Sequence, residues 1–448
     1  MKKIMILAAS AALVLAGCAK IETVSNQEMD APVGFSAYTS NALTKAGAYG
    51  EMNNTLLQQT EANGGGFGVF AYKTSGDYPT TNTTLAPNFM YNQKVLYNAG
   101  AWGYSPIKYW PNQLAGTPST GADTDSQTDP AHAYAVDKVS FFAYAPYVAA
   151  TASSGAVATT NEGIIKLSDY DDTSDPKVTY KVTNDLDKQV DLVWGVSHGA
   201  TWNNVAGGTN TPANGKPYLN LQKPAIGTAI HFYFHHALAQ LKLQAIAAYN
   251  QVAAGGEAKN GVKITIDNVV ITVPGMYETA VLNLNNTAVD ANNKPIPLWE
   301  SEDGDSDLTL TVAKANINAK LQDGGDVNAS AQPAGVIYKA APYTKPFDED
   351  VDVIMDGKYF TLIPKSGSDV TVNVKVTYYV TTDDANLANG HSRVENVISH
   401  DVTFTDGFKA GTRNIIRMIL GVSEVKFEAS VEDWVDGLSA DVDLPKNS

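Results

Sequence analysis

One segment decides the fold class: Val370-Thr-Val-Asn-Val-Lys-Val-Thr-Tyr-Tyr-Val380. Valine occupies every second position of its first seven residues, and Thr371, Asn373 and Lys375 stand between the valines. Successive side chains of a β-strand point to opposite faces of a sheet. This period of two therefore predicts a strand with one face on a core and one face in water.

The same period recurs along the chain, whereas helical periodicity is rare. It is found in segments 67–72, 262–266, 269–273, 308–312 and 425–431. Polar stretches rich in Gly, Asn, Ser, Thr, Asp and Pro separate these segments, at 111–130, 150–162, 203–217 and 381–392. Such stretches have the composition of loops. Many short strands with long polar loops predict an all-β protein built of β-sandwiches.

The length of the chain allows two or three domains. It has 448 residues, enough for each domain to bury a core of its own. We expect two domains, because the polar stretch 203–228 separates a half rich in Tyr and Trp from a half dominated by Val and Ile. The predicted junction lies near residue 228.

Charge and motifs argue against several classes of function. The chain has 47 acidic and 31 basic side chains, for a net charge of −16. An acidic surface repels phosphate, so nucleic acid is not expected as a partner. The sequence contains no Gly-x-Ser-x-Gly, no P-loop, no His-Glu-x-x-His and no Cys/His pair. We therefore expect neither an enzyme nor a bound cofactor.

The N-terminus has the pattern of a bacterial lipoprotein signal. Lys2 and Lys3 precede an uncharged apolar run, 4–16, that is too short to span a bilayer. The run ends in Leu15-Ala16-Gly17-Cys18, which has the form of a lipobox. We predict a signal peptide at 1–17, cleavage between Gly17 and Cys18, and an anchor in the outer membrane through lipid on Cys18. Cys18 is the single cysteine of the chain, so no internal disulfide is expected.

Eight short blocks stand in an order that resembles the fimbrillin family of Bacteroidetes, the subunits of lipoprotein-derived pili. Each block is weak alone, but together they cover residues 35–434. They are Phe35-Ser-Ala-Tyr-Thr-Ser with Thr44-Lys45-Ala46, then segments 67–72, 102–111, 140–146, 191–195, 234–243 and 359–364, and the closing Val425-Lys-Phe-Glu-Ala-Ser-Val-Glu-Asp-Trp434.

The resemblance implies two transthyretin-like β-sandwich domains in tandem. They would cover residues 46–228 and 229–436. A lipidated segment, 18–45, would precede them, and an acidic tail, 437–448, would follow them. The resemblance also implies a pilus subunit that travels as a lipoprotein precursor and polymerises by strand exchange once a protease has removed its N-terminal strand.

Both strands that such an exchange needs have candidates. The removable strand lies at 33–39, where Val33, Phe35 and Ala37 alternate with smaller or polar residues. The donor strand lies at 426–435, and its candidate residues are Phe427, Ala429, Val431 and Trp434. An inserted strand satisfies the exposed backbone of a sheet edge while its side chains fill pockets.

The cleavage site departs from the family pattern. Relatives activated by an arginine-specific protease carry an arginine before the first domain, whereas the first arginine here is Arg393. Lys45 is the one lysine between Lys20 and Lys73. The candidate activation cleavage is therefore Lys45–Ala46, and the alternatives are cleavage at another residue or no cleavage.

Two functions follow from these features. The first is a structural subunit of a cell-surface fimbria that supports adhesion and has other fimbrial subunits as partners. The alternative is a surface lipoprotein or pilus-tip adhesin that does not polymerise and binds a glycan or a protein of a host or bacterial surface. A stalk subunit needs both a removable and a donated strand, whereas a terminal subunit lacks one of them.

Three other groups of residues have a functional and a structural interpretation. Trp102, Tyr104, Tyr109 and Trp110 could stack on sugars or clamp a loop onto the core, and we favour packing. His231, His235 and His236 suggest zinc, but on a strand His231 and His235 stand about 13 Å apart, so we expect no metal site. Three acidic clusters, at 123–129, 302–307 and 348–352, lack calcium-loop spacing and are expected to be solvated loops.

Overall fold

The structure is a computed structural model of the chain. It describes residues 31–39, 51–111, 137–157, 162–199, 201–203, 209–224, 228–247, 262–290, 294–301, 305–313, 321–322, 336–339, 355, 358–420 and 425–433. Within these residues the helical structure consists of α1 (Asn54–Leu57), two 3-10 helices, Glu61–Asn63 and Leu186–Lys188, and a 3-10 position at Met355. Nearly all the rest of the regular structure is β, which confirms the all-β prediction.

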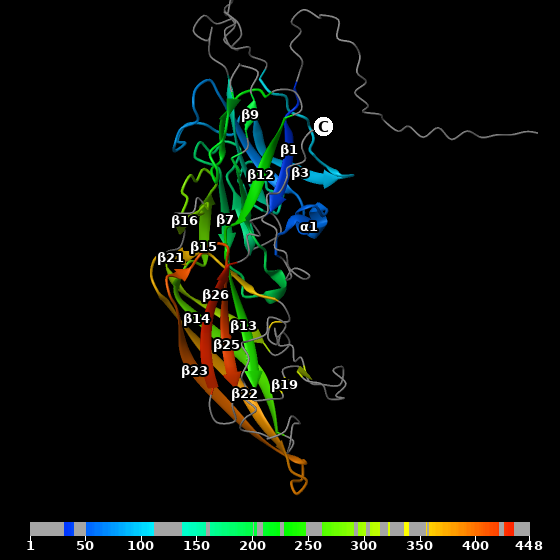
Figure 1. The fold of residues 1–448 in the computed structure, drawn as a ribbon, viewed down its shortest axis with the longest axis vertical. Coiled ribbons are helices and arrows are strands. Elements are labelled where there is room, and N and C mark those ends of the chain that lie inside the picture. Colours follow the sequence, from blue (N-terminus) through cyan, green and yellow to red (C-terminus); the bar gives the residue numbers. More distant parts are fainter. Residues whose placement is uncertain are drawn as a thin grey trace, which may run out of the picture.

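The molecule is elongated, and its upper part in Figure 1 contains the N-terminal strand. The largest sheet there, which we call the β1 sheet, has the order β1-β12-β8-β5-β2-β3-β4, with β11 paired to β5. Its strands are β1 (Gly34–Thr39), β2 (Phe67–Thr74), β3 (Met90–Asn98), β4 (Ala101–Gly103), β5 (Lys138–Ala145), β8 (Val193–Val196), β11 (Tyr218–Leu221) and β12 (Ala229–His236).

A four-stranded sheet, β16-β15-β7-β6, completes the upper part together with a small ribbon. Its strands are β6 (Gly163–Leu167), β7 (Lys177–Lys181), β15 (Thr279–Asn283) and β16 (Leu298–Ser301). The ribbon pairs β9 (Trp202–Asn203) with β10 (Thr209–Asn210). Strand pairing thus crosses residue 228, because β12 belongs to the β1 sheet and β15 pairs with β7. The division at 228 stays a prediction.

The lower part of Figure 1 holds two further sheets. One has the order β18-β19-β14-β22-β23, with β17 on β14; the other has the order β20-β13-β25-β26; and β21 pairs with β24. Their strands are β13 (Ala239–Ala247), β14 (Val262–Met276), β17 (Ser306–Ala313), β18 (Leu321–Gln322), β19 (Val336–Lys339), β20 (Phe360–Leu362), β21 (Lys365–Ser366), β22 (Val370–Asp383), β23 (His391–Phe404), β24 (Gly407–Phe408), β25 (Thr412–Leu420) and β26 (Val425–Asp433).

The segment that decides the fold class lies in β22 and has the predicted faces. Val372, Val374 and Val376 are fully buried, whereas Thr371 and Lys375 on the opposite face are exposed. On that outer face Thr371 forms a hydroxyl hydrogen bond with Thr403 of β23, at 2.9 Å. The period of two in the sequence is therefore a period of two in burial.

Two apolar clusters make up the core. One continues from the four-stranded upper sheet into both lower sheets. The second lies on the opposite face of the β1 sheet and includes the inward side chains of β1 and β12. β5 has a side chain in each cluster, Phe141 in the second and Phe142 in the first, so the β1 sheet is buried on both faces at its centre.

Candidate strand-exchange site

The candidate removable strand is inserted deeply into the second cluster. Val33 is 2% exposed, Phe35 6% and Ala37 1%. The residues that alternate with them, Gly34, Ser36 and Tyr38, are half-buried on the other face of the sheet. The alternation predicted from the sequence thus divides this strand into a core face and an outer face.

Phe35 anchors the strand in a cage of aromatic rings. Its ring centroid lies 6.2 Å from Phe67, 6.0 Å from Phe141 and 6.0 Å from Phe232. The ring of Tyr104, at 5.4 Å, closes the cage. The contacts with Phe67 and Phe141 are edge-on, the geometry that aromatic pairs prefer. These rings come from four different segments, so Phe35 holds several parts of the core together.

The backbone of β1 pairs with one strand, β12, in parallel. Six residue pairs run from Gly34 opposite Ala229 to Thr39 opposite Phe234. On the outer face, Ser36 and His231 Nδ1 form a hydrogen bond across the ladder. β1 is the terminal strand of its sheet, and the sheet curls until β4, at its far end, contacts β1.

A loop segment fastens the beginning of β1. The Val33 amide donates to the Lys108 carbonyl at 2.8 Å, and the Trp110 amide donates to the Ala31 carbonyl at 2.9 Å. The Tyr104 hydroxyl donates to the Val33 carbonyl at 2.8 Å. We call residues 104–110 the clasp, because their backbone and side chains hold the chain just before the strand.

The end of β1 is fastened by helix α1. The amide of Thr39 and its hydroxyl both donate to Asn54 Oδ1, at 2.7 and 3.1 Å. The chain just before the helix is tied down as well, since the Met52 amide donates to Asp191 Oδ2 at 2.9 Å. β1 is therefore held at both ends as well as along β12.

The candidate donor strand, β26, is held differently. It pairs antiparallel with β25 over nine positions, from Thr412 opposite Asp433 to Leu420 opposite Val425. Ala429 is exposed, and Val431 is 48% exposed. The β26 backbone at Phe427 takes part in the pairing, whereas Trp434 lies outside the described residues.

The predicted processing residues lie outside the described part of the chain. These are Gly17 and Cys18 at the signal cleavage and lipidation site, and Lys45 and Ala46 at the activation site. Within the described part, no helix combines the length and apolar character that crossing a membrane requires.

Comparison of the sequence with known proteins tests the predicted resemblance to fimbrial subunits. No model of a known protein family matches the sequence. Fimbrium subunit Fim1C of Phocaeicola vulgatus is 24% identical over 454 aligned residues, which cover 97% of each chain. This chain resembles a fimbrial subunit from end to end. The predicted resemblance to fimbrial subunits is thereby confirmed.

Solved structures agree with the fold. A crystal structure of a fimbrial protein from Bacteroides vulgatus covers 90% of this chain and 99% of its own, at 20% identity and a TM-score of 0.53. A fimbrial assembly protein from Parabacteroides distasonis also aligns over 90% of this chain, but its TM-score is 0.32. The first of these likenesses supports the fold.

The four aromatics considered for sugar stacking do not form one open surface. Trp110 is buried, with its ring 5.5 Å from Trp202 and 5.6 Å from Phe141. Trp102 is half-buried, and Tyr104 belongs to the Phe35 cage. Tyr109 is exposed. Because a sugar must reach a free ring face, this arrangement favours the packing interpretation. The aromatic block 102–110 is recognisable in the sequence, whereas its role in fastening β1 is visible only in the structure.

The three histidines of β12 contact different groups. His231 bonds to Ser36, and burial lowers its pKa below the ordinary value. His235 lies beside the ring of Tyr233. His236 is buried, and its Nδ1 lies 2.8 Å from a carboxylate oxygen of Asp191. Among the described residues, no three His, Cys, Asp or Glu side chains come together as metal ligands.

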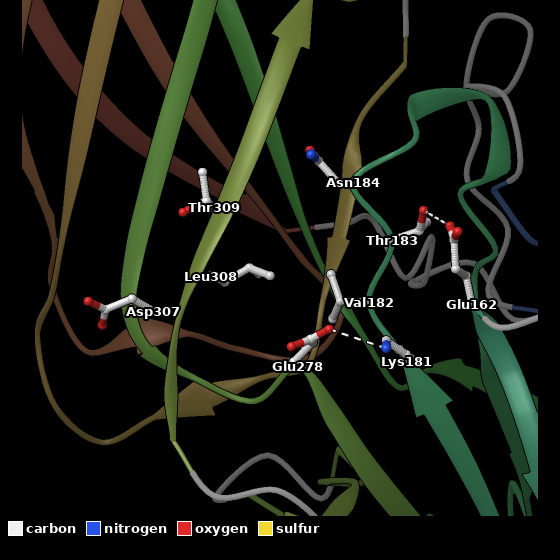
Figure 2. Close-up of a pocket in the computed structure, with 9 residues that line it drawn as sticks. All are labelled: Glu162, Lys181, Val182, Thr183, Asn184, Glu278, Asp307, Leu308 and Thr309. Carbon is white, nitrogen blue, oxygen red and sulfur yellow. Dashed lines mark hydrogen bonds and ion pairs between the residues drawn. The ribbon is translucent and has the colours of Figure 1, made fainter.

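A polar pocket of about 360 Å³ lies between β7, β15 and β17 (Figure 2). Its charged groups, together with Thr183 and Asn184, pair with one another or with backbone. Lys181 and Glu278 form an ion pair at 3.3 Å, and the Thr183 hydroxyl donates to Glu162. Asn184 accepts the Thr311 amide at 2.7 Å. Such pairing is typical of a packing interface, here between the upper four-stranded sheet with β7 and β15 and the lower sheet with β17.

Proposed function

We propose that this protein is a structural subunit of a cell-surface fimbria that supports adhesion and polymerises by strand exchange. One observation carries the proposal: the N-terminal strand fills a core position but is the terminal strand of its sheet. It also ends at Thr39, six residues before the candidate cleavage at Lys45. The similarity to fimbrium subunit Fim1C over nearly the whole chain supports the same role.

The precursor would be exported as a lipoprotein. In this proposal the signal peptide leaves between Gly17 and Cys18, and lipid on Cys18 carries the precursor to the outer membrane. Cleavage after Lys45 then separates lipid and β1 from a body of two transthyretin-like β-sandwich domains. The body itself has a net negative charge, so its partners are other subunits and surface glycans or proteins, not nucleic acid.

The physical driving force for exchange is the slot that β1 would leave. Its loss exposes one edge of β12 and the apolar cage formed by Phe67, Phe141 and Phe232. Unpaired backbone at a sheet edge and a trough of apolar side chains both favour an incoming strand. Strand 426–435 of a second subunit is the proposed occupant, and repetition of this step yields a fibre.

The proposal is tested by controlled removal of β1. Residues 42–45 are replaced by the recognition sequence of a site-specific protease, and the purified precursor is cleaved. We expect a ladder of detergent-resistant oligomers on unheated gels, which boiling collapses to the trimmed monomer. The unmodified chain treated with the same protease is the control and should stay monomeric.

Two measurements separate the proposed function from the adhesin alternative. If cleaved protein stays monomeric while mass spectrometry shows residues 425–448 intact, the subunit is not a stalk component. Mass spectrometry of the N-terminus in native envelopes gives the second measurement. A start at Ala46 supports activation, whereas a start at Cys18 means that the finished protein keeps its lipid and does not exchange β1.

A further inference from the structure

The inward side chains of β1 have a close counterpart near the C-terminus. The core face of segment 33–39, which contains β1, presents a Val-x-Phe-x-Ala pattern followed two residues later by threonine. β26 repeats this pattern, and valine replaces the threonine. The two series are Val33, Phe35, Ala37 and Thr39, and Val425, Phe427, Ala429 and Val431.

Size and shape match at each of these positions. The Phe35 position needs a large aromatic side chain, because four rings surround it. The Ala37 position needs a small one, since it stands opposite Phe232 in the ladder and is 1% exposed. Overfilling a packed core costs stability, so the order of large and small matters as much as apolar character. Threonine and valine have the same branched shape.

The Val-x-Phe-x-Ala pattern also occurs in another strand that faces the second cluster. Val139, Phe141 and Ala143 of β5 have the same spacing and face the same cluster. β5 is hydrogen-bonded between β2 and β8, so it is enclosed on both edges. β26 pairs with one strand, β25, and is the terminal strand of its sheet. Of these two strands, only β26 is placed to leave its sheet.

β26 would gain burial by the move. Ala429 and Val431 belong to the same face as their partners in β25, Ile416 and Asn414, which are fully buried. Yet Ala429 is exposed and Val431 is 48% exposed. The two positions of β1 that they would occupy are 1% and 2% exposed. Burial of apolar surface favours the exchanged state.

The outer face of the slot accepts the remaining residues of β26. Gly34, at the beginning of β1, has room for a side chain, since an added Cβ would lie 3.5 Å from the Ala229 Cβ, an ordinary contact. A lysine, Lys426, would take this place. The outer face is only half-buried, so the polar residues Glu428 and Ser430 of β26 can keep contact with water there.

We propose that β26 of a second copy enters the slot parallel to β12 and in the register of β1, with Phe427 in the Phe35 cage and Ala429 at the Ala37 position. This inference rests on the proposed exchange of β1. It adds the orientation, the register and the two side chains that select the incoming strand.

Cysteine pairs test orientation and register together. The parallel register places Lys426 opposite Ala229 and Ser430 opposite Tyr233. The reversed strand would exchange these two partners. Neighbouring strands lie about 4.8 Å apart, within the range that a disulfide spans. Cleavage removes Cys18, so the introduced thiols are the only ones in the trimmed body.

Two parallel variants combine Ala229→Cys with Lys426→Cys, and Tyr233→Cys with Ser430→Cys. Two reversed variants combine Ala229→Cys with Ser430→Cys, and Tyr233→Cys with Lys426→Cys. After cleavage and mild oxidation, we expect the parallel pairs to give a ladder that survives boiling and collapses on reduction. The reversed pairs should run as monomers after boiling.

Other results have separate meanings. Two results overturn the inference but leave strand exchange intact. In the first, the reversed pairs give ladders that survive boiling. In the second, unheated ladders form but no pair gives a ladder that survives boiling. Absence of unheated ladders from the cleaved parent overturns the proposed function itself. The thermal melting of each uncleaved precursor is compared with that of the parent, so that a misfolded variant is recognised.

A size test at Ala429 needs no crosslink. Ala429→Phe places a ring at an exposed position of the monomer, but it would overfill the Ala37 position of the slot. We expect the precursor to melt as the parent does and the unheated ladder to be lost. Ala429→Ser keeps the side chain small and should retain the ladder. Equal ladders from both variants would overturn the assignment of Ala429.

Discussion

The two terminal strands of the molecule differ in what holds them. β26 has nine paired positions in an antiparallel ladder, whereas β1 has six in a parallel one. By backbone pairing alone, β26 is the better fixed of the two. The side chains show the opposite: inward residues of β1 are 1–6% exposed, and those described in β26 are exposed. Length of ladder and depth of insertion are therefore separate properties of a strand.

Magnitudes indicate which property matters more. A typical hydrogen bond contributes about 0.5–1.5 kcal/mol net, because the unfolded chain bonds to water. Full burial of a phenylalanine side chain contributes about 1.5–3 kcal/mol, and packing adds to this. Phe35 alone is thus comparable with two or more ladder bonds. This comparison explains how β1 can be firmly inserted although its ladder is shorter than that of β26.

The largest effect is expected at Phe35. Phe35→Ala removes the ring from its cage and should lower the free energy of unfolding of the precursor by about 3–5 kcal/mol. Denaturant unfolding of the uncleaved chain measures it. Val431→Ala, at the exposed position of β26, is the control and should change the same quantity by less than about 0.5 kcal/mol. Similar losses for both variants would show that insertion depth does not distinguish the two strands.

Much of this comparison could be predicted from the sequence, because alternation is a local property. The valines of β22 and the series Val33, Phe35 and Ala37 predicted strands and core faces that the structure contains. Which strands become neighbours depends on residues far apart in sequence. The parallel pairing of β1 with β12 joins segments about 195 residues apart, and no local pattern indicates it.

The fastening of β1 shows the same limit. The block from Trp102 to Trp110 was expected to pack on the core, since aromatics and prolines are typical of a clamped loop. That its backbone bonds to Ala31 and Val33 could not be predicted, because any loop carbonyl can accept an amide. Asn54 likewise appears in sequence as an ordinary helix-start residue, and its contact with Thr39 is visible only in three dimensions.

A second prediction compares the same substitution in both strands. Ala37→Leu adds three carbons to a packed position and should destabilise the precursor by about 1–3 kcal/mol. Ala429→Leu adds them to an exposed position and should change stability by less than about 0.5 kcal/mol. Thermal and denaturant unfolding of the uncleaved chains measure both. Equal destabilisation would mean that β26 is packed in solution as tightly as β1.

The smallest effect concerns the clasp. Tyr104→Phe keeps the ring in the Phe35 cage but removes the hydroxyl, which donates to the Val33 carbonyl at 2.8 Å and accepts the Lys108 amide at 3.2 Å. We expect a loss of about 1–2 kcal/mol, because each hydrogen bond contributes about 0.5–1.5 kcal/mol net and the longer one contributes less. Hydrogen exchange at the amides of β1 is followed in the uncleaved precursor. It should become faster, because the free energy of opening of the strand falls by the same amount. Tyr109→Phe, whose side chain is exposed, is the matched control. If Tyr104→Phe leaves exchange unchanged, the clasp orients the loop but does not retain the strand.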